Sequence, residues 1–147
     1  HFLKVSVEVR KLQRRSDYKS NAKLLRSIPG IGPLTTVQLL TEIEDINRFN
    51  SFKKFNSFVG FKPMTHSSGE HDWGGRMTYC QNKSLRSSLI ECAWTTISTD
   101  PVMLQRYEEL RKRMTGKRAI IIIARKLLSR LFYVLKNQQA YEIGLAR

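Results

Sequence analysis

Apolar residues recur at helical spacing from Ile120 to Leu135, and this stretch constrains the fold more than any other feature of the chain. Its first part, Ile120 to Ile123, would also suit a buried strand. The residues that follow keep a period of about 3.6, which an amphipathic helix has and a strand does not. We therefore expect one long central helix with other helices packed around it. The later apolar positions are Ala124, Leu127, Leu128, Leu131, Phe132 and Leu135.

Two more segments show helical spacing, and a proline separates them. Leu85 to Ile97 predicts one helix, with Trp94 on its apolar face, and Met103 to Met114 predicts a second. Asp100-Pro101 lies between them, and a proline is tolerated at the start of a helix. Residues 63–84 are polar and glycine-rich, which favours a long functional loop. The predicted fold class is mainly α, a helical bundle containing a helix-hairpin-helix motif and this loop.

The chain divides into two parts in this interpretation. Residues 1–20 carry apolar residues at helical spacing and are expected to be the tail of an upstream coiled-coil helix. Residues 21–147 form one domain, with the helix-hairpin-helix at 22–44, the loop at 63–84 and the helical bundle at 85–136. Because no initiator Met precedes His1, we expect the sequence to belong to a longer protein.

A row of phenylalanines lies between the hairpin and the loop, at a spacing of three residues. On a short helix this spacing gathers the rings on one side. Such a face could stack on unpaired bases, as in single-strand binders, but a buried core face fits the spacing better. The row consists of Phe49, Phe52, Phe55, Phe58 and Phe61.

The segment from Ile28 to Gly32 predicts a tight turn between two helices, the second running from Pro33 to Ile43. Glycines permit the positive backbone angles of such a turn and leave its amides uncovered beside a helix N-terminus, where phosphate binds. This favours a grip on the nucleic-acid backbone over an ordinary Pro-Gly turn with Ile28 and Ile31 simply buried. The predicted contacts are Gly30, Ile31, Gly32 and Thr35.

The charge of the chain favours a polyanionic partner. Among its 147 residues, 26 Lys and Arg stand against 12 Asp and Glu, which gives a net charge of +14. Nucleic acid is the expected partner, and we expect no membrane association because the longest apolar run is too short to span a bilayer. Cys80 and Cys92 are too few for a disulfide scaffold, so we expect free thiols in a reducing cytoplasm.

The order of several motifs resembles the C-terminal transposase domain of the insertion sequence 110/116/902 family of transposases. The hairpin at Leu25 to Ile43 is similar to that family's helix-hairpin-helix, and Ser68-Gly69 is similar to its serine motif. Together the matching motifs cover most of residues 22–136. The others are Phe58-Val59-Gly60-Phe61-Lys62-Pro63, Gly75-Arg76-Met77-Thr78, Asn82-Lys83-Ser84-Leu85-Arg86 and Ala124-Arg125-Lys126-Leu127-Leu128.

The resemblance implies a DNA recombinase in which Ser68 attacks the DNA phosphate and forms a covalent intermediate. It also implies an N-terminal RuvC-like domain whose acidic residues hold a divalent metal (Mg), so we expect no cofactor in the present stretch. The implied partners are DNA, a guide RNA encoded by the element and further copies of the chain in a homo-oligomer. The implied location is the bacterial cytoplasm, in association with the nucleoid.

A serine hydroxyl is a weak nucleophile and needs an activating group. His66 and His71 are near enough in sequence to act as a base or phosphate partner, and Ser67 is the alternative nucleophile if the motif is shifted by one residue. Cationic and polar side chains could neutralise charge on the phosphate and bind DNA. The residues expected in that role are Arg76, Asn82, Lys83 and Arg86.

Two other function classes remain open from the sequence. One is a helix-hairpin-helix DNA-binding module without chemistry, and the other is an oligomerisation domain. Carboxylates are scarce near the loop, whereas a two-metal phosphoryl-transfer site needs several. We therefore expect this stretch alone not to cut DNA, and no metal site within it.

Overall fold

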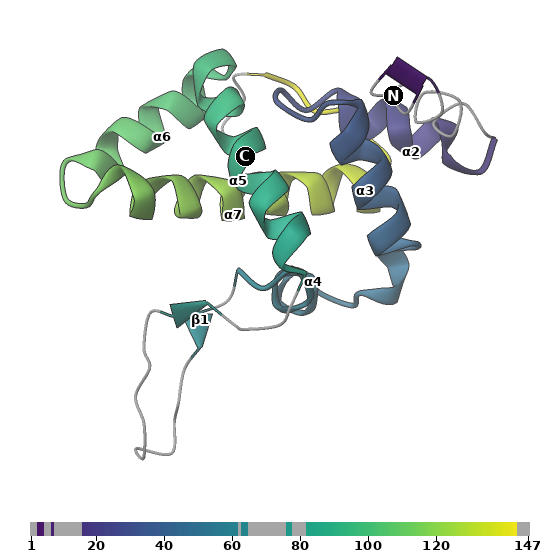
Figure 1. The fold of residues 1–147 in the computed structure, drawn as a ribbon, viewed down its shortest axis with the longest axis horizontal. Coiled ribbons are helices and arrows are strands. Elements are labelled where there is room, and N and C mark those ends of the chain that lie inside the picture. Colours follow the sequence, from purple (N-terminus) through teal and green to yellow (C-terminus); the bar gives the residue numbers. More distant parts are fainter. Residues whose placement is uncertain are drawn as a thin grey trace.

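The structure is a computed structural model that describes residues 16–61 and 82–143, residues 3, 4 and 7, and the backbone of two short strands at residues 63–64 and 76–77. Helices dominate the described part of the chain, as the sequence predicts (Figure 1). The elements in order are α2 (Ser16–Arg26), α3 (Pro33–Ile43), the short 3-10 helix η1 (Ile46–Arg48), α4 (Phe52–Val59), β1 (Pro63–Met64), β2 (Arg76–Met77), α5 (Lys83–Thr99), α6 (Pro101–Arg111) and α7 (Gly116–Asn137).

The central element is α7, which confirms the long helix expected from the apolar period. It begins after Thr115, whose hydroxyl accepts a hydrogen bond from the Arg118 amide at 3.4 Å, and it ends at Gln138, which has a left-handed backbone. Its apolar face is buried from Ala119 to Leu135. Helices α2, α4, α5 and α6 all pack on it, so α7 lies at the middle of the bundle (Figure 1).

Helices α5 and α6 meet at the predicted proline. The Asp100 carboxylate accepts a hydrogen bond from the Val102 amide at 3.0 Å, and Pro101 occupies the first turn of α6. This arrangement satisfies the start of the second helix without a proline in its interior. Trp94 corrects one expectation, because it is 43% exposed rather than on the buried face of α5. Its ring lies 5.8 Å from that of Tyr107 on α6, outside the main core.

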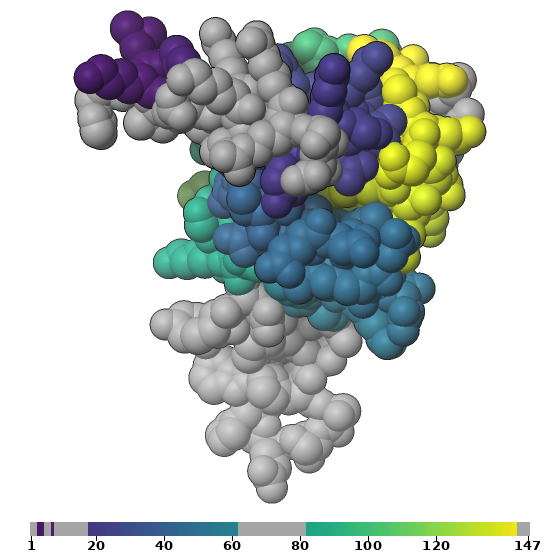
Figure 2. Space-filling view, turned by 90° about the vertical axis from the view of Figure 1, so that its right-hand side faces the viewer, coloured from purple at the N-terminus to yellow at the C-terminus, as the bar shows by residue number. Residues whose placement is uncertain are grey.

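Helices α2 and α3 pack on each other and lie near the C-terminal end of α7 (Figure 1). Helix α2 runs without interruption from Ser16 through residue 20, where the sequence interpretation divides the chain. Figure 2 shows the face on which the segments from α3 to α4, in blue, lie beside the end of α7 and the residues after it, in yellow.

The phenylalanine row belongs to the core, which is the interpretation that the sequence favoured over base stacking. Phe55 and Phe61 are almost completely buried, and Phe49 is 8% exposed. The Phe55 ring lies 5.1 Å from that of Phe49 and 5.6 Å from that of Phe132 on α7. These ring contacts attach α4 to the central helix. Phe49, Phe55 and Phe61 are buried and not available to unpaired bases, whereas Phe52 and Phe58 are partly buried against the core.

The segment expected to be a loop contains two short strands. Pro63–Met64 pairs in antiparallel fashion with Arg76–Met77, and α5 already begins at Lys83. Strand pairing satisfies backbone groups that a twenty-residue loop would leave to solvent. Residues 65–75 and 78–81 of this segment, including the serine motif, lie outside the described residues.

Candidate nucleic-acid interface

The turn between α2 and α3 is a compact structure closed by its own hydrogen bonds. The Ser27 hydroxyl donates to the Leu24 carbonyl at 2.5 Å, and the Ile28 amide donates to the Leu25 carbonyl at 3.1 Å. Gly30 then adopts a left-handed backbone with φ of 93°, which reverses the chain toward α3. A helix, a turn and a second helix therefore follow one another here, with α2 beginning before the predicted start at residue 22.

Gly30 was expected to offer its backbone to phosphate, but its Cα faces helix α5. The Thr96 hydroxyl donates to the Pro29 carbonyl at 2.6 Å and fixes the turn against α5. A Cβ atom on Gly30 would lie 2.5 Å from the Cys92 carbonyl oxygen. Glycine is thus required here for the close approach of turn and helix.

Ile31 corrects another expected contact. Its side chain is only 5% exposed, and its amide donates to the Ile28 carbonyl at 3.2 Å. Neither the side chain nor the amide is left for a phosphate. Ile28 and Ile31 are both buried, as in the alternative interpretation of the sequence, an ordinary Pro-Gly turn.

Gly32 and the first turn of α3 form the open side of the turn. No atom lies within 4 Å of a Cβ built on Gly32, and this N-cap residue has no side chain to satisfy the first amides of the helix. Pro33 has no amide hydrogen, whereas Leu34 and Thr35 have first-turn amides that lack an intrahelical acceptor. Leu34 is 51% exposed beside them. The first-turn amides of α3 without an intrahelical acceptor are therefore those of Leu34 and Thr35, beside the open Gly32.

The second predicted group of contacts lies at the start of α5. Asn82 precedes the helix with a positive φ of 22°, and Lys83 is exposed. Arg86 is not simply a surface cation, because its guanidinium donates to the Gly60 carbonyl at 3.2 Å and ties α5 to the end of α4. It therefore positions two helices, which the sequence interpretation did not foresee.

Helix α3 runs alongside α5, and the two groups of predicted contacts lie at different points along these helices. Thr35, near the start of α3, accepts a 3.7 Å contact from the Cys92 thiol. Gln38, one turn later, bonds to Ser84 at 3.1 Å and to Ser88 at 2.7 Å. Since Lys83 precedes Cys92 by nine residues, the two groups lie roughly 14 Å apart along α5.

The predicted catalytic residues belong to the segment between β1 and α5. Ser67, Ser68, His66 and His71 lie outside the described residues, and Arg76 contributes only the backbone of β2. Within residues 16–61 and 82–143, no three His, Cys, Asp or Glu side chains gather into a metal site. Burial raises the pKa of the free Cys92 thiol above its ordinary value, which disfavours the reactive thiolate form. No described helix is both long and apolar enough to cross a membrane.

Exposed cations surround the junction of α6 and α7. The first turn of α7 carries Lys117 and Arg118 and has no acidic residue. Positive charge at the positive end of a helix dipole is unfavourable by itself and becomes favourable beside a polyanion. The exposed basic residues of this junction are Arg111, Lys112, Arg113, Lys117 and Arg118.

Sequence reasoning missed a structure formed after α7. Residues 138–142 lie across α2 and the turn. The Gln138 side-chain amide donates to the Asn21 side-chain oxygen at 3.1 Å, and the Tyr141 backbone amide donates to the Ser27 hydroxyl at 2.9 Å. The Tyr141 hydroxyl donates to the buried Asp100 carboxylate. Lys126, Arg130 and Tyr133 on α7 line a pocket beside this segment. The i, i+4, i+7 spacing of these three residues is the sequence pattern that could have indicated this face of α7.

The Tyr141→Phe substitution is expected to lower the free energy of unfolding by about 2 kcal/mol, because it leaves one oxygen of the buried Asp100 without a donor. Burial, together with the hydrogen bond to Asp100 and its charge, raises the pKa of Tyr141 above the ordinary 10.0. The contribution of Tyr141 to stability is therefore present below about pH 10 and is lost as the pH rises above that value. Chemical denaturation between neutral and alkaline pH measures both effects. An unchanged stability in Tyr141→Phe would contradict this role.

Comparison with known proteins relates the chain to insertion-sequence transposases. The model of a family described as "Transposase IS116/IS110/IS902 family" matches residues 22–108. The "uncharacterized 43.6 kDa protein" of insertion element IS110 from Streptomyces coelicolor is 30% identical over 120 residues, which cover 81% of this chain and 30% of that protein. The transposase for insertion sequence element IS1111A from Coxiella burnetii is 29% identical over 125 residues, covering 82% of this chain and 34% of the transposase. The chain thus spans about a third of the length of these relatives.

Proposed function

The chain belongs to the IS116/IS110/IS902 family of transposases, and from this premise we propose that it binds duplex DNA and supplies Ser68 as the nucleophile for strand cleavage and transfer. The observation that carries the proposal is the extent of the family match. Residues 22–108 include the hairpin, the serine motif and the start of α5. The net charge of +14 supports a polyanionic substrate.

In this proposal the DNA backbone is held by the open side of the hairpin. The first-turn amides of α3 point away from the helix, and the partial positive charge at its N-terminus attracts a phosphate. Gly32 leaves room for the approach because no atom lies within 4 Å of its Cβ position. The cations at the junction of α6 and α7 add contacts that do not depend on base sequence.

The proposed chemistry is the displacement of one strand from a phosphate by Ser68. The serine oxygen forms a bond to phosphorus, the bond from phosphorus to the leaving strand oxygen breaks, and a histidine, His66 or His71, accepts the hydroxyl proton. The leaving oxygen takes up a proton in turn. A guide RNA and a homo-oligomer complete the proposed assembly.

The Gly32→Asp substitution tests the DNA contact at the hairpin. An aspartate at the N-cap accepts hydrogen bonds from the first-turn amides and repels a phosphate. We expect duplex affinity to fall about tenfold, equivalent to about 1.4 kcal/mol. The stability of the helix should stay unchanged or rise by up to about 1 kcal/mol. Fluorescence anisotropy with a labelled duplex measures the first quantity and thermal unfolding the second.

Gly32→Ala is the matched control, because it adds a Cβ without charge or hydrogen-bonding groups. We expect its duplex affinity to lie between those of the parent chain and Gly32→Asp, because its methyl group occupies part of the space beside the amides but does not repel a phosphate. If Gly32→Asp is folded and binds the duplex as tightly as the parent chain, the first turn of α3 is not the contact with DNA.

A further inference from the structure

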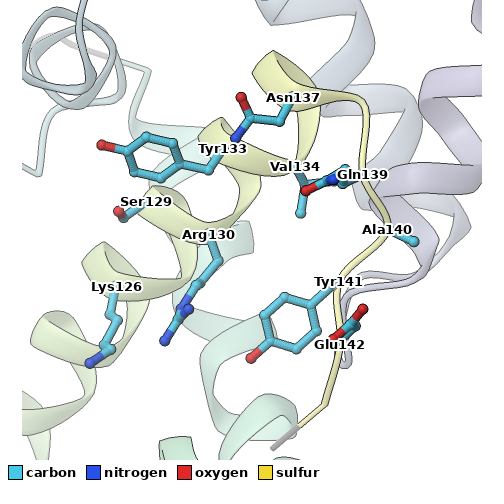
Figure 3. A pocket seen from close by; sticks show the side chains of 10 residues that line it. All are labelled: Lys126, Ser129, Arg130, Tyr133, Val134, Asn137, Gln139, Ala140, Tyr141 and Glu142. Carbon is cyan, nitrogen blue, oxygen red and sulfur yellow. The ribbon is translucent and has the colours of Figure 1, made fainter. Parts of the chain in front are cut away.

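A pocket of about 370 Å³ lies between α7 and the chain that follows it (Figure 3). One wall is the face of α7 that carries Lys126, Arg130 and Tyr133, and the other is the segment that carries Gln139 and Tyr141. The volume is at the low end of the range for small-ligand sites, which begins at roughly 300 Å³. One nucleotide is of a size to fit, whereas a duplex is not.

The second wall is held in place without a ligand. Three hydrogen bonds attach it to the rest of the fold, through Asn21, Ser27 and Asp100. The Asp100 carboxylate that accepts from the Tyr141 hydroxyl is 1% exposed, so this attachment is part of the core. A preformed wall lowers the ordering cost of binding.

The charge of the pocket favours an anion. Lys126 and Arg130 lie one helical turn apart, and both side chains extend to the same side of α7, with Arg130 toward the hydroxyl end of Tyr141 (Figure 3). Among the described residues, ion pairs join Arg48 to Glu44 and Arg106 to Glu109, and neither Lys126 nor Arg130 takes part in one. Glu142 is the one acidic lining residue. Two neighbouring cations repel each other unless an anion lies between them.

The pocket also offers aromatic surface and amide groups. The Tyr133 side chain is 54% exposed, which is unusual for a large ring on a central helix. A tyrosine ring beside cations is the combination that single-strand binders use, since every base has a flat face that can stack. Asn137 and Gln139 line the same pocket and are exposed, so their amides can hydrogen-bond the edge of a base.

We propose that this pocket binds one unpaired nucleotide of a single-stranded nucleic acid, with its base against Tyr133 and its phosphate between Lys126 and Arg130. Bases of a duplex are stacked inside the double helix and cannot reach such a ring. The site is therefore a second nucleic-acid contact, beyond the duplex contact proposed at Gly32. The inference does not require that the hairpin binds DNA.

The test compares single strands with a duplex in the full 147-residue chain. The probes are a fluorescent oligothymidine, an oligouridine and a duplex of the same length, titrated by anisotropy. Arg130→Gln and Tyr133→Leu are each expected to weaken single-strand binding about tenfold, which is the scale of one lost stacking or phosphate contact. Neither change should alter duplex binding by more than about twofold.

Each variant has a matched control. Arg125→Gln removes the same charge from the same helix but lies outside the pocket, and Tyr133→Phe keeps the ring. Both controls should bind single strands within about twofold of the parent chain. Equal unfolding midpoints by circular dichroism show that the variants are folded.

The outcomes separate the possible sources of the nucleotide. Loss of binding to both single strands supports a pocket for any unpaired nucleotide, and loss for one probe alone identifies RNA or DNA as the source. Unchanged single-strand binding, or an equal loss in Arg125→Gln or with the duplex, would overturn the proposal. Duplex binding by Gly32→Asp is a separate measurement, so failure of one site is distinguishable from failure of the other.

Discussion

Gly30→Ala is expected to destabilise the chain by about 3 kcal/mol, which corresponds to a fall of roughly 10 °C in the unfolding midpoint. Two effects add. Alanine must adopt the φ of 93° that the turn requires, and its Cβ would lie 2.5 Å from the Cys92 carbonyl oxygen and 2.8 Å from the Thr96 hydroxyl. A backbone carbonyl inside a helix cannot move aside, so the turn must separate from α5.

Gly32→Ala is the control for this prediction, because the same chemical change occurs two residues away without either penalty. Its φ is −91°, and no atom lies within 4 Å of the new Cβ. We expect its stability to stay within about 1 kcal/mol of the parent chain. Differential scanning calorimetry of the two variants gives the comparison. Similar midpoints for both would show that the turn does not pack on α5 as described.

The difference between these two glycines also shows what the sequence can and cannot predict. Both were expected to expose backbone for phosphate, because a glycine in a turn is compatible with a bare amide or with a close packing contact. The choice depends on Cys92 and Thr96, which are more than sixty residues away in the chain. Local spacing predicts the turn, but only the packing of α5 shows which side of it is open.

The helices themselves were accessible from the sequence because each carries a local signal. The apolar period predicts α7, and Asp100-Pro101 predicts the start of α6. The exposure of Trp94 was not predicted, because helical spacing places this residue with the apolar residues of α5. Its ring instead contacts Tyr107 on the next helix, α6. The pocket beside α7 was missed for a similar reason. Its second wall depends on Tyr141 reaching Asp100, a contact across 41 residues that no local pattern records.

The second large effect is expected at Ser68. Ser68→Ala removes the only oxygen through which this residue could bond to phosphorus, so covalent attachment to DNA should be abolished rather than reduced. Duplex binding should remain within about twofold, since the proposed phosphate contacts at the hairpin come from Gly32 to Thr35. Ser67→Ala is the matched control, because it removes a neighbouring hydroxyl and should leave the attachment intact. Loss of attachment in Ser67→Ala alone would move the nucleophile by one residue.

The most direct test of the proposed function is to trap the covalent complex. The longest natural protein that contains this sequence is incubated with labelled donor and target DNA and the RNA of the element, then digested, and the peptide that retains a nucleotide is identified by mass spectrometry. We predict a nucleotide attached to Ser68, with no such peptide from the Ser68→Ala protein. Attachment that persists in Ser68→Ala, or that maps to another residue, would contradict the assignment of the nucleophile.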